Sequence, residues 1–344
     1  MKGTVIAIGT IAGHEVAAWM VDGQLEDIAL AYDGLGPGAI LRGTVGRPVK
    51  GLGGVFVDLP GSTRGFLRQT RGLAPGKPVL VQVAGVAEPG KAVPLTTRLM
   101  IKGRLVILTP QAPGINVSRQ IRNEGLRGDL TALAESALAG ADPALGLILR
   151  SACEDAAPDE VAAEAAELRA LTEAVLADDK GAPELLLDAP APRDLAWRDW
   201  PVPDVFDDGP EALDQHGVRA ALDALLHAEV SLSGGASMTV EPTRALVAVD
   251  VNTGPDTSPA AGLKASIAAV RELPRQLRLR GLGGQVVIDF APFAKRDRAA
   301  LEQVLRKAFR GDGTETSLAG WTPLGNFELQ RRRDRAPLAD WLRP

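Results

Sequence analysis

ALVAVDVNT at residues 245–253 and GGQVVIDF at residues 283–290 are the two stretches that decide the fold of the second half of this chain. Each is an apolar run rich in β-branched residues, and each reaches an aspartate near its end, Asp250 and Asp289. Between them, residues 259–280 carry apolar side chains at helical spacing, which predicts a crossover helix between two parallel strands. If the strands are neighbours, both aspartates lie at the same carboxyl edge of the sheet.

Paired carboxylates at one sheet edge suit a hard divalent cation. Mg²⁺ takes oxygen ligands and is typically held by one or two carboxylates, while waters and substrate phosphate complete its shell. Asp250 and Asp289 meet that need, and Asn252 can orient a ligand or a water. The same spacing also fits two aspartates that cap the turns after their strands through local hydrogen bonds. The residues alone leave both interpretations open.

Three phrases in a fixed order make the pattern specific: DVNT at residues 250–253, RQLRLR at residues 275–280, and the Gly-Gly and Ile-Asp-Phe of the second strand. Together they resemble the catalytic domain of the ribonuclease E/G family of bacterial endoribonucleases. The resemblance implies that Asp250 and Asp289 are catalytic residues that bind magnesium, and that Asn252 positions one of them. It also implies metal-assisted hydrolysis of single-stranded RNA to 5′-phosphate and 3′-hydroxyl ends, in RNA processing or decay.

The resemblance covers essentially the whole chain and implies a multi-domain fold of the α/β and β classes. Its parts are a split, reduced RNase H-like domain at residues 1–34 and 181–229, an inserted OB-fold RNA-binding barrel at 35–97, a 5′-sensor region at 98–180, and a deoxyribonuclease-I-like α/β catalytic domain at 230–344. The barrel also has support from the residues themselves, because short β-runs separated by Gly-rich turns are typical of small barrels.

Two phenylalanines flank a glycine-rich loop of the expected barrel, Phe56 and Phe66. Alternation alone fits either burial in the barrel core or exposure for base stacking. Aromatic residues make up only 4% of the chain, and two of them beside one loop favour stacking. The resemblance implies that Phe56, Phe66 and Lys91 bind RNA.

A pocket for a 5′-monophosphate is implied by the resemblance within residues 98–180. Its residues in this sequence are Gly103, Ile107, Arg150 and Ser151. Arginine beside a hydroxyl suits phosphate oxygens, because a guanidinium group donates two parallel hydrogen bonds. Glu315 aligns with a second arginine of relatives, so the preference for a 5′-monophosphate is left open.

Charge is spread unevenly along the chain. The net charge is −5, but residues 154–214 carry a net charge of −14 and residues 264–335 a net charge of +7. A cationic surface around a magnesium site suits a polyanionic substrate. A single arginine on a helix more often belongs to an ordinary solvated face. The run RRRDR at residues 331–335 favours the first interpretation.

Cys153 is the single cysteine, so neither a disulfide nor a C-x₂-C zinc site can form within the chain. The expected cofactor is Mg²⁺, with Mn²⁺ also suited to oxygen ligands, and no zinc. We therefore expect a short, ribonuclease G-like form without the zinc link of many relatives, in which any homo-oligomer uses other surfaces. The start lacks the features of a signal peptide, and no run approaches the ~20 apolar residues of a membrane span. A cytoplasmic protein without a membrane partner is expected.

Two other functions stay open. Pro292 stands where relatives have an aspartate, and Arg244 where many have a glutamate; both are expected close to the predicted metal site. Pro292 and Glu315 motivate a non-catalytic RNA-binding relative as the alternative. A nuclease that acts on DNA is the other, since a fold does not fix its substrate. The RNA-type barrel argues against it.

Overall fold

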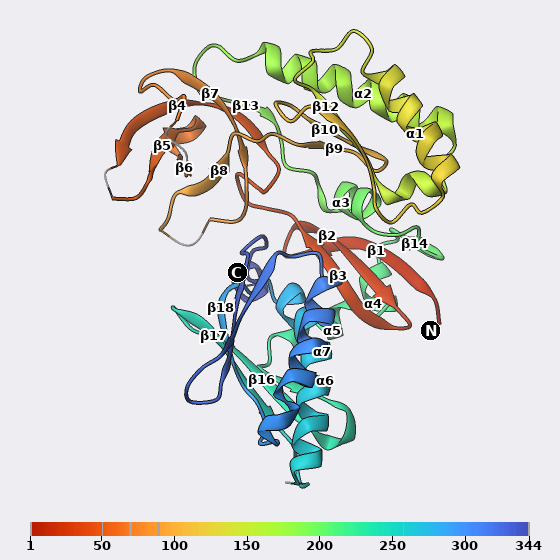
Figure 1. The fold of residues 1–344 in the computed structure, drawn as a ribbon, viewed down its shortest axis with the longest axis vertical. Coiled ribbons are helices and arrows are strands. Elements are labelled where there is room, and N and C mark those ends of the chain that lie inside the picture. Colours follow the sequence, from red (N-terminus) through yellow and green to blue (C-terminus); the bar gives the residue numbers. More distant parts are fainter. Residues whose placement is uncertain (1, 50, 69–70, 88–89, 257, 343–344) are drawn as a thin grey trace. The chain divides into compact units, whose positions relative to one another are not determined.

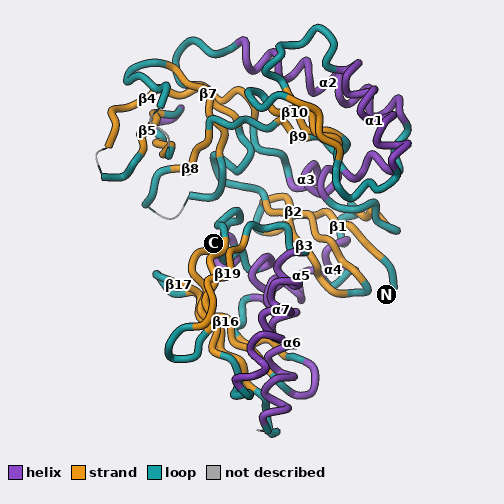
Figure 2. The backbone as a smooth tube through the Cα atoms, viewed as in Figure 1, coloured by secondary structure: helices purple, strands orange, loops and turns teal. Residues whose placement is uncertain are grey.

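The computed structural model describes residues 2–49, 51–68, 71–87, 90–256 and 258–342. The chain folds into two compact units, one formed by Met1–Leu30 together with Pro203–Pro344 and the other by Ala31–Val202. Helices, strands and loops of both units are drawn in Figures 1 and 2. The first unit is therefore built from both ends of the sequence.

A four-stranded sheet in the order β14-β1-β2-β3 belongs to the first unit. The consecutive strands are antiparallel, and β14, from much later in the sequence, pairs parallel to β1. Asp22 and Gly23 both have positive φ at the β2–β3 turn, a conformation that Asp-Gly favours in tight hairpins. The elements are β1 Thr4–Ile11, β2 His14–Val21, β3 Gln24–Leu30, β14 Val205–Asp207, α4 Ala212–Gln215 and α5 Val218–Leu225.

A six-stranded mixed sheet in the order β15-β16-β17-β18-β20-β19 completes the unit. β17 and β18 are parallel neighbours, and α6 connects them as the expected crossover helix. Helices α6 and α7 lie along one side of this sheet (Figure 1), where apolar side chains from both layers form a single core. The elements are β15 Glu229–Ser231, β16 Ser237–Pro242, β17 Leu246–Asn252, α6 Pro259–Leu279, β18 Gly284–Asp289, α7 Arg298–Arg310, β19 Thr316–Trp321, β20 Phe327–Arg331 and α8 Leu338–Trp341.

A closed five-stranded barrel forms one part of the second unit. Its strands follow the order β4-β5-β6-β8-β7, and β4 pairs with β7 to close the ring. β6 and β8 are parallel, whereas the other pairs around the ring are antiparallel. β13 adds to the barrel beside β4. The strands are β4 Ile40–Val49, β5 Gly54–Asp58, β6 Arg64–Leu67, β7 Pro78–Val83, β8 Val93–Thr96 and β13 Glu184–Leu187.

The other part of the second unit is a small sheet in the order β11-β12-β10-β9, packed with two long helices, α1 and α2. Asn123 caps α1, because its side chain accepts a hydrogen bond from the Leu126 amide. The short helix α3 follows β13. The elements are β9 Ile101–Lys102, β10 Val106–Thr109, β11 Gly114–Val117, α1 Glu124–Ala137, β12 Gly146–Leu149, α2 Pro158–Ala177 and α3 Pro192–Asp199.

The mixed α/β fold with a barrel agrees with the predicted fold class at this level. The crossover helix expected at residues 259–280 is present as Pro259–Leu279, and the expected Gly-punctuated β-runs are four strands of the barrel, β4 to β7. The predicted domain boundaries and domain identities stay predictions; residues 181–202, assigned from the sequence to the split domain, lie in the second unit. Within the described ranges, the helices are too short or too polar to cross a membrane.

Candidate functional site

Asp250 and Asp289 lie side by side at the ends of β17 and β18. They are register partners in the parallel pairing, and neighbouring strands are about 4.8 Å apart. Val249, Val251 and Ile288 are buried in the core that the sheet shares with α6 and α7. Because side chains alternate along a strand, both aspartates point to the opposite face, where they are exposed. The register brings the two predicted carboxylates together.

Asn252 shares this face with Asp250, two residues further along β17. Its Nδ2 donates a hydrogen bond of 2.9 Å to Oδ2 of Asp250. This contact fixes one carboxylate oxygen and leaves the other directed elsewhere. The sequence prediction that the asparagine orients a carboxylate therefore has a direct geometric counterpart.

The paired carboxylates have the donor chemistry of a magnesium site. Like charges opposite each other on adjacent strands are destabilising, and a divalent cation between the two aspartates would remove that repulsion. Among the described residues there is no cluster of three or more Asp, Glu, His or Cys side chains suited to a metal. Two carboxylates still fit Mg²⁺, which usually keeps several waters.

Pro292 and Arg244 occupy different positions relative to these aspartates. Pro292 is exposed in the loop that follows β18, and its carbonyl oxygen would lie 2.0 Å from a Cβ added at Gly262, so this loop packs on the first turns of α6. Arg244 lies in the turn between β16 and β17, and the four strand steps from Leu246 to Asp250 alone span about 13 Å at ~3.3 Å per residue. The expectation that Arg244 lies close to the metal site is therefore wrong, because it stands at the amino end of the strand.

Phe56 and Phe66 form an aromatic pair on the outside of the barrel. They are register partners on β5 and β6, with ring centroids 5.5 Å apart in an edge-to-face arrangement. Val55, Val57 and Leu67 alternate with them and fill the barrel core, whereas both rings remain partly exposed. The alternative that both rings are barrel core is wrong.

A cationic side chain, that of Arg64, accompanies this aromatic pair. The Arg64 guanidinium lies 6.0 Å from the centroid of the Phe56 ring, within the range of a cation–π contact. Sequence reasoning missed Arg64, although its place two residues before Phe66 on the same face was a usable signal. Lys91 is exposed in the loop that leads into β8.

Of the residues of the predicted 5′-phosphate pocket, Arg150 follows β12 and contacts Gly103. Arg150 Nη1 donates to the carbonyl oxygen of Gly103 at 2.6 Å. Ser151 is exposed at the start of a 3₁₀ turn, Ser151–Glu154. Ile107 lies on β10 and pairs with Ile148 of β12. A side chain at position 103 would collide with Glu164, because an added Cβ would lie 2.1 Å from its Oε1.

The Arg150 guanidinium is also bound by the end of helix α3. Nη1 donates to the Arg198 carbonyl at 3.0 Å, and Nη2 donates to Oδ1 of Asp199 at 2.8 Å. Arg198 binds the other oxygen of the same carboxylate, Nη2 to Oδ2, at 2.7 Å. The sequence offered no signal for these partners, which lie almost fifty positions from Arg150.

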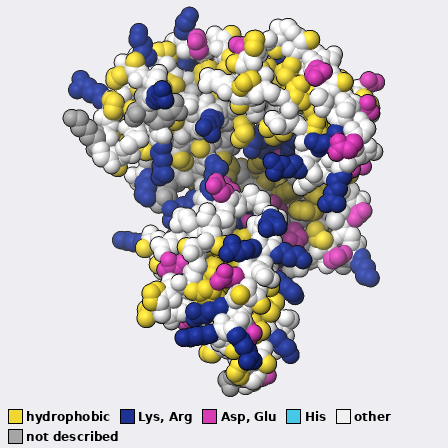
Figure 3. Space-filling model, viewed as in Figure 1, with side chains coloured by type: hydrophobic (Ala, Val, Ile, Leu, Met, Phe, Trp, Pro, Cys, Tyr) yellow, Lys and Arg dark blue, Asp and Glu magenta, His cyan; other side chains and the backbone are white. Residues whose placement is uncertain are grey.

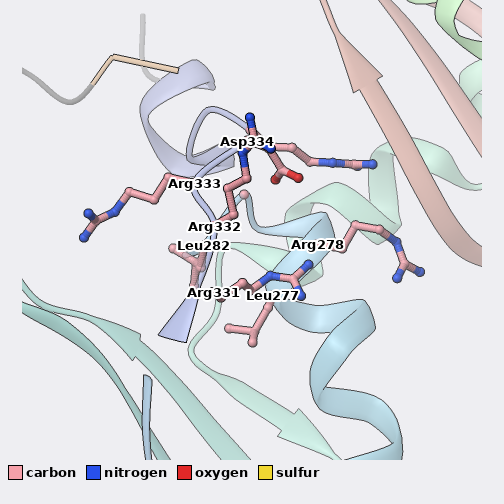
Figure 4. Close-up of a pocket in the computed structure, with 9 residues that line it drawn as sticks. Leu277, Arg278, Leu282, Arg331, Arg332, Arg333 and Asp334 are labelled. Atoms are coloured by element: carbon pink, nitrogen blue, oxygen red, sulfur yellow. The ribbon is translucent and has the colours of Figure 1, made fainter. Parts of the chain in front are cut away.

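The arginine run at residues 331–335 is not a uniform cationic surface. Arg331 is 2% exposed and ion-paired with Asp312, whose side chain is 1% exposed. Figure 4 shows the Arg331 side chain directed towards α6, beside Leu277. Arg335 forms an ion pair with Asp27. Part of the charge that the sequence assigned to substrate binding therefore holds the fold together.

Cationic side chains elsewhere are dispersed. On the face drawn in Figure 3, Lys and Arg side chains occur in both units, with Asp and Glu among them. A cavity of about 310 Å³ between β3 and α6 contains three arginines, yet two of these have carboxylate partners, Arg275 with Glu272 and Arg278 with Asp312. This cavity is polar and internally neutralised, unlike the edge that holds the two aspartates.

The sequence was compared with known protein families and with curated proteins. The sequence matches the model of the Ribonuclease E/G family over residues 100–207 and 202–334, more than half of the chain. The chain belongs to the ribonuclease E/G family. The residues matched to this family include β17 and β18, which carry Asp250 and Asp289, and also Arg150 and Asp199.

Several curated members of the ribonuclease E/G family are similar over most of this chain. Ribonuclease E of Nostoc sp. is 28% identical, with 93% of this chain and 54% of its own length covered. Ribonuclease E of Synechocystis sp. is also 28% identical, with 93% and 56% covered. Ribonuclease G of Salmonella typhimurium is 25% identical, with 87% and 73% covered. The chain spans about half the length of the two ribonuclease E relatives.

Proposed function

We propose that this protein is a magnesium-dependent endoribonuclease that hydrolyses phosphodiester bonds in single-stranded RNA. The observation that carries the proposal is the register pairing of Asp250 and Asp289 at one exposed sheet edge, in a chain of the ribonuclease E/G family. The curated relatives are named as ribonucleases E and G. The expected products carry 5′-phosphate and 3′-hydroxyl ends, and the role is RNA processing or decay.

The two aspartates would hold the cation, and Asn252 would act on one of them. When bound, Mg²⁺ supplies Lewis-acid polarisation of the scissile phosphate and a water of lowered pKa. The Asn252 amide keeps Asp250 Oδ2 hydrogen-bonded and so limits rotation of that carboxylate. With two acidic ligands, the remaining coordination positions are left to water and to phosphate oxygens. Mn²⁺ suits the same oxygen ligands.

The barrel would bind RNA as an OB-fold. Its strand order, β4-β5-β6-β8-β7 closed by β4, fits a five-stranded OB-type barrel. On its outer face Phe56 and Phe66 offer aromatic rings, and Lys91 adds a positive charge. Stacking of a base on an aromatic ring contributes about 1–3 kcal/mol and tolerates any sequence. Single-stranded RNA is the partner that this surface fits.

The remaining assignments belong to the same proposal. The small sheet with α1 and α2 would be the 5′-sensor region, with Gly103, Ile107, Arg150 and Ser151 at the positions of its phosphate pocket. The six-stranded sheet with α6 and α7 would be the deoxyribonuclease-I-like domain, and the β14-β1-β2-β3 sheet would belong to the RNase H-like domain.

A cleavage assay tests the metal site directly. Purified protein is incubated with 5′-labelled, A/U-rich single-stranded RNA, with and without Mg²⁺, beside Asp289→Asn. We expect cleavage only with the metal, and a loss of about a thousandfold or more in the variant, because a catalytic cation contributes several kcal/mol to transition-state stabilisation. Asp223→Asn, the same charge change at an exposed position of α5, is the matched control and should cleave as the wild type does.

Two outcomes would contradict the proposal. Cleavage that persists in EDTA or in Asp289→Asn would show that this edge is not the catalytic centre. Folded wild-type protein that binds the RNA in Mg²⁺ without cutting it would favour the non-catalytic RNA-binding alternative, which the loop at Pro292 motivates. A matched DNA strand in the same assay separates the ribonuclease from a nuclease acting on DNA.

A further inference from the structure

The guanidinium group of Arg150 donates through both terminal nitrogens, three hydrogen bonds in all. Nη1 contacts two carbonyl oxygens, of Gly103 and Arg198, and Nη2 contacts the Asp199 carboxylate. A phosphate group binds arginine through this same pair of nitrogens, in the two-pronged geometry that carboxylates share. A phosphate that binds end-on, through both Nη atoms, needs donors that these acceptors already hold.

Asp199 is held in this position from two sides. Its oxygens bind two different guanidinium groups, Oδ1 that of Arg150 and Oδ2 that of Arg198. Burial opposes ionisation of the carboxyl group, but the hydrogen bonds and charges of Arg198 and Arg150 outweigh it and hold the pKa of Asp199 below its ordinary value. Asp199 is therefore an anion at neutral pH, which would repel an incoming phosphate.

Helix α3 is fastened to the same surface at a second point. Arg104 donates to the Trp197 carbonyl, and its guanidinium lies 4.8 Å from the Trp197 ring centroid. Pro192 and Ala196 of this helix are buried. The carbonyl end of a helix attracts cations. At the end of α3, the Trp197 carbonyl binds Arg104, and the Arg198 carbonyl and the Asp199 carboxylate bind Arg150.

We propose that Asp199 takes the place of a 5′-phosphate on Arg150, so that the protein acts on RNA without regard to phosphorylation of the 5′ end. The inference rests on the 5′-phosphate role of Arg150 in the proposed function. It makes Asp199 a specificity-determining residue: the carboxylate satisfies the arginine internally and excludes the ligand. Removal of its charge should expose a phosphate site that the wild-type protein keeps closed.

Binding of a small phosphate ligand tests this independently of RNA cleavage. Uridine 5′-monophosphate and uridine are titrated by calorimetry into the wild type, Asp199→Asn, Asp199→Asn with Arg150→Gln, and Asp194→Asn. We expect the wild type to bind the two ligands alike, and Asp199→Asn to bind the monophosphate at least about tenfold tighter than the wild type does. The double variant should lose that gain. Asp194→Asn removes an exposed acid of the same helix and should match the wild type.

Two results would overturn the inference. One is wild-type protein that prefers the monophosphate over uridine and loses that preference in Arg150→Gln; this comparison needs no substitution at position 199. The other is folded Asp199→Asn, checked by its thermal unfolding, that gains no affinity for the monophosphate. As a second readout, the wild type should cleave 5′-phosphorylated and 5′-hydroxyl RNA at equal rates. If no RNA is cleaved at all, the proposed nuclease fails while the nucleotide titration still decides the role of Asp199.

Discussion

The two predicted phosphate-handling sites differ in the origin of their contacts. Asp250 receives its hydrogen bond from Asn252, two positions along the same strand, and both aspartates are exposed. Arg150 is bound by residues 47 to 49 positions away. When the contacts of a site come from one strand, the sequence motif predicts their geometry. When they come from distant segments, the motif does not show whether a ligand can reach the site. The first site is open, and the second is closed by the chain itself.

The strongest test of the open site combines its two aspartates. If Asp250 and Asp289 hold one cation, Asp250→Asn, Asp289→Asn and the double variant should each lose about a thousandfold or more in cleavage rate, because residues that act as a unit are not additive. Rates are measured under single-turnover conditions with Mg²⁺ in excess.

Protein stability provides the control for this prediction. Each single substitution removes one of two neighbouring like charges, so the free energy of unfolding without metal should stay the same or rise slightly. Losses that simply multiply in the double variant, or a lower unfolding free energy in the singles, would mean that the aspartates are separate turn caps and not a shared metal site.

A smaller effect is expected at Asn252. Its amide fixes Asp250 Oδ2, so Asn252→Ala should weaken metal affinity or activity about ten- to a hundredfold without abolishing either, as groups that orient a metal ligand typically do. The measurement is the Mg²⁺ concentration that gives half-maximal cleavage. Thr239→Ala on β16, opposite Asp250 in register, is the matched control. A loss as large as that of Asp289→Asn would make Asn252 itself a ligand.

Much of the open site could be predicted from the sequence, because its information is local. Strand periodicity, a helix of the right length between two β-runs and the position of one aspartate in each run determine which side chains share an edge. Pairing of Asp250 with Asp289 follows from these features alone. Four of the five barrel strands, β4 to β7, were equally accessible as short β-runs punctuated by glycine, whereas β8 was not among the expected strands.

The closed site and the ionic core could not be predicted in the same way. Nothing near Arg150 in the sequence indicates that Asp199 binds it, since the contact depends on where α3 packs within the second unit. Arg331 is the first of three consecutive arginines. It is the last residue of β20 and is buried against Asp312, whereas Arg332 and Arg333 follow the strand and are exposed. Local charge count does not distinguish an arginine that binds ligand from one that neutralises a buried aspartate.

The barrel face is a second open surface, and its test is Phe66→Ala. Removal of one stacking ring should weaken binding of single-stranded RNA by about 1–3 kcal/mol, measured by fluorescence anisotropy in the Asp289→Asn background so that the RNA stays intact. The ring is partly exposed, so the fold should survive. Leu67→Ala, next to it but in the barrel core, should instead destabilise the protein by about 2–5 kcal/mol. RNA binding unchanged by Phe66→Ala would remove this face from the RNA path.

The smallest expected effect concerns the Asp199 contact as a source of stability. Its pKa is lowered in the folded protein, so its contribution is present above the unfolded value of about 3.9 and is lost as the pH falls through the folded value. The Asp199 side chain is 36% exposed, and solvent screening limits the contribution to about 1 kcal/mol or less. Asp199→Asn should therefore have a lower free energy of unfolding than the wild type at pH 7, and the difference should shrink below about pH 4.

Urea unfolding of both proteins at pH 7, 5 and 3.5 measures this difference, with Asp194→Asn as the matched substitution on the same helix. High salt should reduce the difference at pH 7, because the Asp199 ion pairs are partly exposed to solvent. A difference that is independent of pH, or a variant that is more stable than the wild type at pH 7, would mean that the carboxylate is strained against Arg150 and does not satisfy it. In that case the closed site would be only weakly held, and a 5′-phosphate could displace Asp199 from the arginine.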